Sequence, residues 1–447
     1  MQIANRLVYK KRYNRRPSDL PAETMSHASQ KIGRWHGAGL LTTTLLGTSV
    51  FILPQMTTAL AGSYAMLSWA LLLIAILPVA MVFAKLSSLY PHAGGPAFFV
   101  EKAFGVTAGR TIGVLFLFVV PIGAPAAIIM TYWFIETLFQ LSPEWGLPVQ
   151  LAIVGLVLAL NYRGIQLSAS LQLGLTLIIT LVVMALLIGG GFIQPTGVQA
   201  HSPPVPFNLN AVLGAMGLAF WSFLGIEALS HLAGDFRDPK RDLVPAIMMG
   251  TLLVGAIYLG CTYLLVDVDT TSTLAMVEVF DRIAGGYGAY VIGLLGIAGG
   301  LATVNVYTAS LARLSWSLSQ DGVLPAYFIK LNQFGVPLRA LQVIQAIMAV
   351  TLVITHYSAH DLEDLIGWVN GVFVLIYLAS MLAALKLLST GHRPLVYVSC
   401  LLCGIIGVGL GTKMLYALAL FALFAPFLWY QQRHLKLKRS ADTHTNG

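Results

Sequence analysis

Gly47-Thr48-Ser49 and Ser222-Phe223-Leu224-Gly225 are the two stretches that decide the fold of this chain. The first interrupts an apolar run from Leu40 to Leu60, and the second interrupts a run from Val212 to Leu232. Backbone that unwinds at membrane depth leaves N–H and C=O groups without partners, so it persists only where it lines a cavity or is buried in protein. Two such interruptions, one in each half of the chain, predict a cavity built from two broken helices.

The composition leaves room for one membrane domain and little else. Of the 447 residues, 57% are hydrophobic and 10% are charged. Twelve spans of about 20 apolar residues would use about 240 residues, so a large water-soluble enzyme is excluded. We expect an all-α polytopic membrane protein with twelve transmembrane helices, in which two five-helix halves form an inverted repeat and helices 1 and 6 are broken.

Charge is distributed unevenly along the chain. The segments 1–36 and 431–447 are rich in Lys and Arg, and they flank the predicted twelve-helix domain at 37–430. With twelve spans, most loop cations fall on the side of the termini, namely Lys85, Lys240, Arg241, Lys330, Arg339 and Arg393, whereas the opposite loops hold Arg282 and Lys413. The positive-inside rule then predicts that both termini are cytoplasmic. The net charge of +8 follows from this asymmetry and does not call for a nucleic-acid partner.

The first interruption has the chemistry of an anion site. The half-helix that follows it offers free N–H groups near Ser49 and Val50, and a helix N-terminus carries a partial positive charge that suits a carboxylate. An ordinary helix with back-bonded hydroxyls is the alternative for this stretch alone, and the second interruption argues against it. Gly47, Thr48, Ser49 and Val50 are therefore candidate binding residues.

The second interruption has the complementary chemistry. The carbonyls from Phe220 to Ser222 end a half-helix and carry partial negative charge, which suits an ammonium group. Trp221 and Phe223 could also stack on a cation, and ordinary helix packing is the alternative for both rings. Together with Leu224 and Gly225, these residues offer no fixed charge for a substrate side chain. The pattern predicts a site for a small, neutral and apolar zwitterion.

Glu227 follows the second interruption and is the most informative single residue. Placing a carboxylate deep in a membrane span raises the free energy of insertion by about 2.5–3.5 kcal/mol, so a functional role is the first hypothesis for such a residue. Glu227 is either a protonatable coupling group or a cap for backbone groups freed by the interruption. His231 lies four residues further on the same helical face, where it either titrates with Glu227 or makes a hydrogen bond near the membrane interface.

Other patterns carry weaker hypotheses. His356 and His360 precede Asp361, Glu363 and Asp364, and this spacing could hold a metal ion. The group lies in a short polar connection, so we interpret it as solvated side chains and expect no metal. The sequence has no GxxxxGK(S/T) phosphate loop, GxSxG elbow or HExxH helix, so we expect neither a cofactor nor an enzymatic activity.

Five spaced motifs resemble the signatures of the amino acid–polyamine–organocation transporter superfamily. They are, in order, Gly47-Thr-Ser-Val-Phe51, Tyr90-Pro-His-Ala-Gly-Gly-Pro96, Phe223-Leu-Gly-Ile-Glu227, Asp238-Pro-Lys-Arg241 with Pro245, and Ser319-Gln-Asp-Gly-Val-Leu-Pro325. The resemblance implies a LeuT-like five-plus-five inverted repeat that works by alternating access. It also implies that Gly47, Thr48 and Ser49 hold a substrate carboxylate, while the region of Trp221 contacts the ammonium group and acts as a gate.

Within this superfamily, the stretch from Phe223 to Pro245 resembles bacterial inner-membrane exporters of methionine and branched-chain amino acids. That resemblance implies export of methionine, leucine, isoleucine and valine, with a proton as the coupling partner. An importer or exchanger of other amino acids or amines is the alternative, and a membrane sensor or channel is a different class. Some proton-driven relatives carry a Lys in helix 5, whereas the matching stretch here is Ser168-Ala-Ser170-Leu-Gln172, which leaves Glu227 or His231 as the coupling candidate.

Overall fold

The protein is described from a computed structural model, which places residues 32–47, 49–92, 94–164, 169–192, 206–266, 274–320, 322–358 and 360–444. Thr48, the centre of the first interruption, lies outside these residues, as does most of the predicted N-terminal arm. The side chains of 169–173 and 433–444 are also outside the description. The predictions made for the helix 5 stretch and for the basic tail therefore stay predictions.

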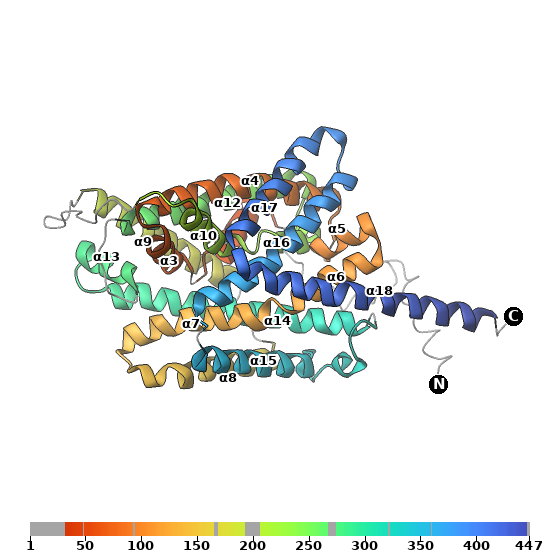
Figure 1. Ribbon diagram of the computed structural model, residues 1–447. Coiled ribbons are helices and arrows are strands. Elements are labelled where there is room, and N and C mark those ends of the chain that lie inside the picture. Colours follow the sequence, from red (N-terminus) through yellow and green to blue (C-terminus); the bar gives the residue numbers. More distant parts are fainter. Residues whose placement is uncertain are drawn as a thin grey trace.

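The described residues form helices joined by short turns (Figure 1). The first half contains α2 (Arg34–Leu46), α3 (Leu53–Ala61), α4 (Ala65–Leu89), α5 (Gly95–Phe104), α6 (Val106–Leu117), α7 (Val120–Phe139), α8 (Gly146–Tyr162) and α9 (Ala169–Phe192). The second half contains α10 (Leu209–Ala219), α11 (Ala228–His231), α12 (Pro239–Leu265), α13 (Ala275–Ala284), α14 (Gly288–Gln320), α15 (Leu338–Tyr357), α16 (Leu362–Leu387), α17 (Arg393–Gly409) and α18 (Met414–His444).

Within the described residues, ten helical segments are long and apolar enough to cross a membrane. One of these segments, Ser49–Leu89, contains both α3 and α4, and α9 adds a shorter apolar helix over Gly174–Gly190. The all-helical membrane fold expected from the composition is confirmed. The number of twelve crossings stays a prediction.

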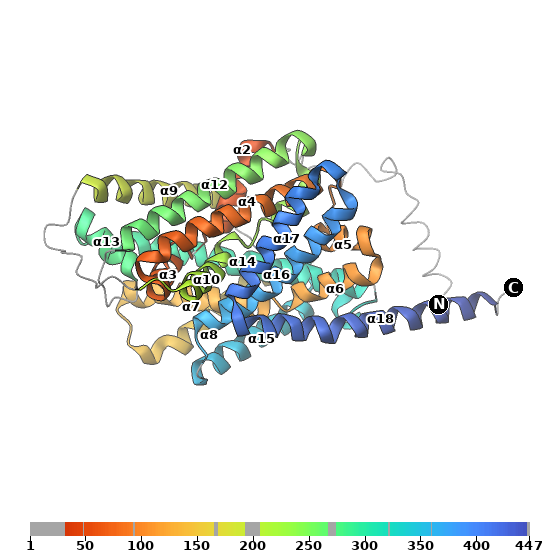
Figure 2. The same cartoon turned by 45° about the horizontal axis from the view of Figure 1, so that its top comes forward.

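The helices pack in two groups around a central region. On one side, α14 lies along α7, and α15 lies along α8 (Figure 1). On the other side, α12 packs against α4 and α2, with α3 and α10 close by (Figure 2). Helix α16 contacts members of both groups, including α7, α4 and α10. The last part of α18 projects beyond the rest of the bundle in both views.

Both predicted helix breaks are present. The first separates α2 from α3 through a short 3-10 turn, η3 (Ser49–Phe51), and the second separates α10 from α11 through η6 (Phe220–Phe223). Each break contains a glycine in the region of positive φ, with φ of +40° at Gly47 and +123° at Gly225. A side chain is strained in that conformation, which is why both interruptions use glycine.

A third interruption separates α6 from α7. Helix α6 ends at Leu117, α7 begins at Val120, and Pro121 stands in the first turn of α7. Proline is tolerated there because its missing N–H would have no partner in a first turn. Pro125 lies inside α7. The two prolines therefore mark a joint between two helices and a position one turn beyond it.

Close approach of α7 and α14 depends on glycine at position 296. A Cβ atom added at Gly296 would stand 2.5 Å from the ring of Phe134, which is fully buried, whereas the same addition at Gly293 would meet Leu138 at 3.6 Å. The ring of Phe134 therefore occupies the space that a side chain at Gly296 would need. The contact fixes how near the two helices come.

We expect Gly296→Ala to lower the stability of the protein, because the added methyl group overpacks the contact with Phe134 at a cost of about 1–3 kcal/mol. Gly155→Ala in α8 is the matched control, since a Cβ added there meets no atom within 4 Å. The apparent thermal unfolding midpoint in detergent measures both. Equal midpoints for the two variants would contradict the packing argument.

Candidate functional site

A cavity of about 60 Å³ lies between the two helix breaks. Residues of both breaks line it, and three further helices close it. The lining comprises Thr44, Leu45, Gly47, Ser49, Val119, Val120, Gly123, Ala124, Ala127, Trp221, Leu224, Thr303, Val304, Tyr307, Val369 and Phe373. All of these residues are uncharged. The cavity is therefore uncharged and mostly apolar, with the hydroxyl-bearing residues Thr44, Ser49, Thr303 and Tyr307 in its lining.

The first break is held by a phenol from α12. The hydroxyls of Tyr258 and Ser49 are 2.6 Å apart, and the Tyr258 hydroxyl also lies 3.4 Å from the carbonyl oxygen of Leu45 and 3.5 Å from that of Leu46. The Ser49 hydroxyl donates to the Leu46 carbonyl at 3.2 Å. These carbonyl groups lie at the C-terminal end of α2, where no following helical turn supplies N–H donors for them. Tyr258 thus supplies a polar group to backbone that the break exposes.

An aromatic pair supports that phenol. The rings of Tyr258 and Trp69, from α4, stack with centroids 4.6 Å apart, and both side chains are fully buried. The indole Nε1–H of Trp69 donates to the hydroxyl of Thr57 in α3 at 2.9 Å. One stacked pair therefore contacts both halves of the broken helix, α2 through Tyr258 and α3 through Trp69.

The second break is held by α16. The amide Nδ2 of Asn370 donates to the carbonyl oxygens of Gly217 and Leu218, at 2.8 and 3.3 Å. These carbonyls lie in the last turn of α10, which ends at Ala219. Asn370 is fully buried, so the hydrogen bonds replace contacts that water would otherwise make.

Glu227 lies beside the same break and is also bonded to α16. Its carboxylate oxygen Oε2 accepts from the Tyr377 hydroxyl at 2.5 Å and from the backbone N–H of Gly225 at 3.0 Å. The Tyr377 hydroxyl lies 3.2 Å from the carbonyl oxygen of Phe223 as well. Glu227 is 4% exposed. Glu227 therefore caps backbone at the second break, which is one of the two roles predicted for it from the sequence. This capping is compatible with the other predicted role, proton coupling.

His231 stands one turn beyond Glu227, at the end of α11. A Cβ atom added at Gly95, the first residue of α5, would meet the imidazole ring at 2.6 Å. The ring also makes an edge contact with Phe116, at a centroid distance of 6.3 Å. The neighbouring Ser230 accepts a hydrogen bond from Ser87 of α4 at 2.7 Å. His231 is thus packed between α5 and α6.

The structure brings four of the predicted binding residues to the cavity wall: Gly47, Ser49, Trp221 and Leu224. Thr48 lies outside the described residues, and the other predicted residues at the breaks do not line the cavity. Val50 and Phe223 are fully buried, and the ring of Phe220 packs against that of Tyr377 with centroids 5.6 Å apart. The Ser222 hydroxyl donates to the Ala219 carbonyl, and the Gly225 N–H donates to the Glu227 carboxylate. These positions shape the break, and the cavity wall reaches beyond it to other helices.

Sequence reasoning missed most of the apolar wall. Helix α7 contributes four small residues, Val120, Gly123, Ala124 and Ala127, and its N-cap residue Val119 adds a fifth. Helix α14 adds Thr303, Val304 and Tyr307, and α16 adds Val369 and Phe373. The signal that could have found this helix is its pair of prolines, Pro121 and Pro125, although they do not identify the lining residues. Nothing in the sequence pattern singled out Tyr258, Asn370 or Tyr377.

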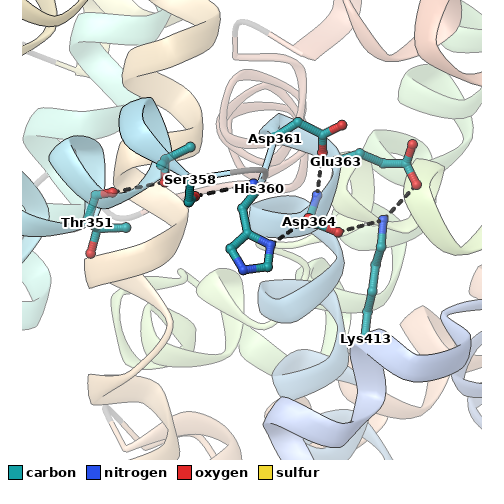
Figure 3. Close-up of polar contacts among 8 residues, drawn as sticks. Thr351, Ser358, His360, Asp361, Glu363, Asp364 and Lys413 are labelled. Carbon is teal, nitrogen blue, oxygen red and sulfur yellow. Dashed lines mark hydrogen bonds and ion pairs between the residues drawn. The ribbon is translucent and has the colours of Figure 1, made fainter.

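The acidic group before α16 forms an ionic cluster (Figure 3). The ammonium group of Lys413 lies 2.6 Å from a carboxylate oxygen of Glu363 and 3.5 Å from one of Asp364. His360 pairs with Asp364 through Nδ1 at 3.0 Å, and Asp361 accepts from the backbone N–H of Asp364 at 3.1 Å. The described residues contain no group of three ligands placed to hold a metal. The cluster instead joins the start of α16 to the connection between α17 and α18.

Comparison with known proteins gives consistent matches over most of the chain. A family model described as Amino acid permease matches residues 32–439. The L-methionine/branched-chain amino acid exporter YjeH of Escherichia coli is 35% identical over 403 residues, which cover 89% of this chain and 96% of that protein. The uncharacterized amino acid permease YecA of Bacillus subtilis is 28% identical, with 80% and 85% covered. The cadaverine/lysine antiporter of Escherichia coli is 22% identical, with 94% and 98% covered.

We expect Tyr258→Phe to lower the apparent thermal unfolding midpoint, because it keeps the ring on Trp69 and removes the hydroxyl from the first break. A buried polar group that loses its hydrogen-bond partner lowers the free energy of unfolding by about 1–3 kcal/mol. Tyr263→Phe is the matched control on the same helix, since Tyr263 is 65% exposed. A midpoint for Tyr258→Phe that equals the control value would show that the hydroxyl does not hold the break.

Proposed function

The chain belongs to the amino acid permease family, and from this membership we propose that it is a secondary active transporter of neutral, apolar L-amino acids. We propose that its substrates are methionine, leucine, isoleucine and valine, and that it exports them across the bacterial inner membrane with both termini in the cytoplasm. The relative from Escherichia coli named as a methionine and branched-chain amino acid exporter supports this choice of substrates and direction.

The observation that carries the proposal is the chemistry of the cavity between the breaks. Every residue that lines it is uncharged, and the walls from α7 and α16 are apolar except for backbone. A cationic substrate side chain would lose its hydration there without gaining a partner charge, and burying an unpaired charge is costly. The lining therefore favours a neutral side chain over a diamine such as the cadaverine named for the more distant relative.

The two breaks supply the polar ends of the site. We propose that the substrate carboxylate binds near Gly47, Thr48 and Ser49, where the N-terminus of the outer half-helix presents N–H groups. The ammonium group then faces the second break beside Trp221, where carbonyl groups at the end of α10 have the opposite polarity. Both Ser49 and Trp221 line the cavity, so one zwitterion can reach them together.

We propose that transport proceeds by alternating access, and the arrangement of the helices around this cavity supports the proposal. The group formed by α7, α8, α14 and α15 packs on one side, and the broken helices pack with α4 and α12 on the other. We propose that one group rocks against the other around the bound substrate, which is how inverted-repeat carriers expose a midplane site to each side in turn.

Glu227 is the proposed site of proton coupling, with His231 as its neighbour. A charged carboxylate accepts hydrogen bonds from Tyr377 and from the Gly225 N–H, whereas a protonated one has a proton to donate and less capacity to accept. A change of protonation would therefore alter the bonds that tie the second break to α16. His231 lies on the cytoplasmic side of this group in the proposed orientation and would exchange protons with it.

Counterflow tests the substrate class. Proteoliposomes preloaded with methionine are expected to accumulate labelled methionine, leucine, isoleucine and valine, and to leave arginine, lysine and cadaverine outside, because the cavity has no fixed charge to pair with theirs. Accumulation of arginine or cadaverine would contradict the proposed substrates. Absence of counterflow with every amino acid would contradict the transporter proposal.

Glu227→Gln tests the coupling site. The amide can still accept the hydrogen bonds from Gly225 and Tyr377, so we expect the variant to fold and its transport rate to lose most of its pH dependence. Glu101→Gln is the control, because Glu101 is exposed in α5. A pH profile of Glu227→Gln that matches the wild type, at a normal rate, would remove Glu227 from proton coupling.

A further inference from the structure

Gly123 occupies a particular place in the cavity wall. It lies at the centre of the α7 face that lines the cavity, between Val119 and Val120 on one side and Ala124 and Ala127 on the other. The opposite wall is made by Val369 and Phe373, one turn apart on α16. Gly123 is the one residue on this face that has no side chain.

Two side chains converge on that position from across the cavity. A Cβ atom added at Gly123 would lie 3.4 and 3.6 Å from the two methyl groups of Val369 and 3.5 Å from the far edge of the Trp221 indole. These are ordinary van der Waals distances, and neither neighbour is backbone. The space in front of Gly123 is therefore about one methyl group deep, and it is bounded by the same indole that stands at the second break.

We propose that Gly123 is a specificity-determining residue, because its missing side chain provides the end of the pocket that receives the substrate's side chain. Trp221 and Val369 bound this end on the other side, so the three residues together set the greatest side-chain size that the site accepts. The inference rests on the proposed function and deepens it, since it assigns the length limit for apolar amino acids to one position on α7.

The physical basis is the balance between space and contact in an apolar pocket. A methyl group at Gly123 would fill the space in front of that residue, because its Cβ would lie within 3.6 Å of both Val369 and Trp221. A substrate of methionine or leucine size could then no longer place the end of its side chain there. One methylene in such a pocket changes discrimination by about 10-fold to 200-fold. A smaller substrate such as alanine does not reach the end of the pocket, so its transport would change little.

The first test is Gly123→Ala in reconstituted vesicles, with kcat/KM measured for methionine, leucine and alanine. The expected result is a fall of about 10-fold or more in the ratio of methionine to alanine. Gly113→Ala is the matched control, because Gly113 is a buried helical glycine in α6 whose added Cβ would meet Leu318 at 3.7 Å and which does not line the cavity. An unchanged ratio in Gly123→Ala, or an equal fall in the control, would overturn the inference.

A second pair of variants uses the opposite change. Val369→Ala removes methyl groups from the other side of the same space, so we expect it to raise kcat/KM for phenylalanine relative to methionine. The double variant Gly123→Ala/Val369→Ala should recover more of the methionine-to-alanine ratio than the product of the two single-variant effects predicts, because both changes alter one shared volume. A double-variant ratio equal to that product would overturn the assignment to a shared space.

The design separates the two proposals. If the wild type shows no counterflow of any amino acid, the proposed function fails, and this inference fails with it. If the wild type transports methionine and leucine but the glycine variant keeps the wild-type ratio, only the role of Gly123 is overturned. Should Gly123→Ala fold poorly, the Val369→Ala result decides the question, since a wild-type phenylalanine-to-methionine ratio there contradicts the proposed size limit.

Discussion

Backbone hydrogen bonding at the two helix breaks is the constraint on which the rest of this structure depends. A helix that ends inside an apolar bundle has carbonyl groups that no water can reach. Tyr258 approaches the carbonyls of Leu45 and Leu46 at the first break, and Asn370 donates to those of Gly217 and Leu218 at the second. Each partner comes from a different, unbroken helix. The breaks therefore require α12 and α16 to lie beside them.

Helix α16 has the most varied role in this arrangement. Within little more than two turns, it supplies Val369 and Phe373 to the cavity wall, and Asn370 and Tyr377 to the second break. Its first turn is joined by Glu363 and Asp364 to Lys413, whose side chain lies over Gly367 (Figure 3). A helix that lines the proposed substrate site and also holds the break can transmit a change at either one to the other. The ionic cluster ties one end of this helix to the connection before α18.

The fold and the breaks were accessible from sequence because they follow from local rules. Apolar runs of membrane length, the glycines at 47 and 225, and a glutamate in a span each have a physical cost that sequence reasoning can recognise. The cavity wall was not accessible in the same way. Gly123 and Val369 are ordinary residues for a membrane helix, and they become significant only because α7 and α16 face each other across the breaks. The partners Tyr258 and Asn370 were missed for the same reason, since their importance depends on contacts between distant helices.

Glu227 shows why a structural role and a functional role need not be alternatives. Its carboxylate accepts from the Gly225 N–H and from Tyr377, whose hydroxyl also lies beside the Phe223 carbonyl. These contacts make Glu227 a cap for the break, and a cap whose accepting capacity changes with its protonation is also a switch. A purely structural cap at this position could be an amide or a hydroxyl, which would avoid the cost of burying an ionisable group. The presence of a carboxylate with 4% exposure is therefore best explained if the protein uses its protonation. The same hydrogen bonds that hold the second break to α16 would then carry the effect of the proton to the cavity wall.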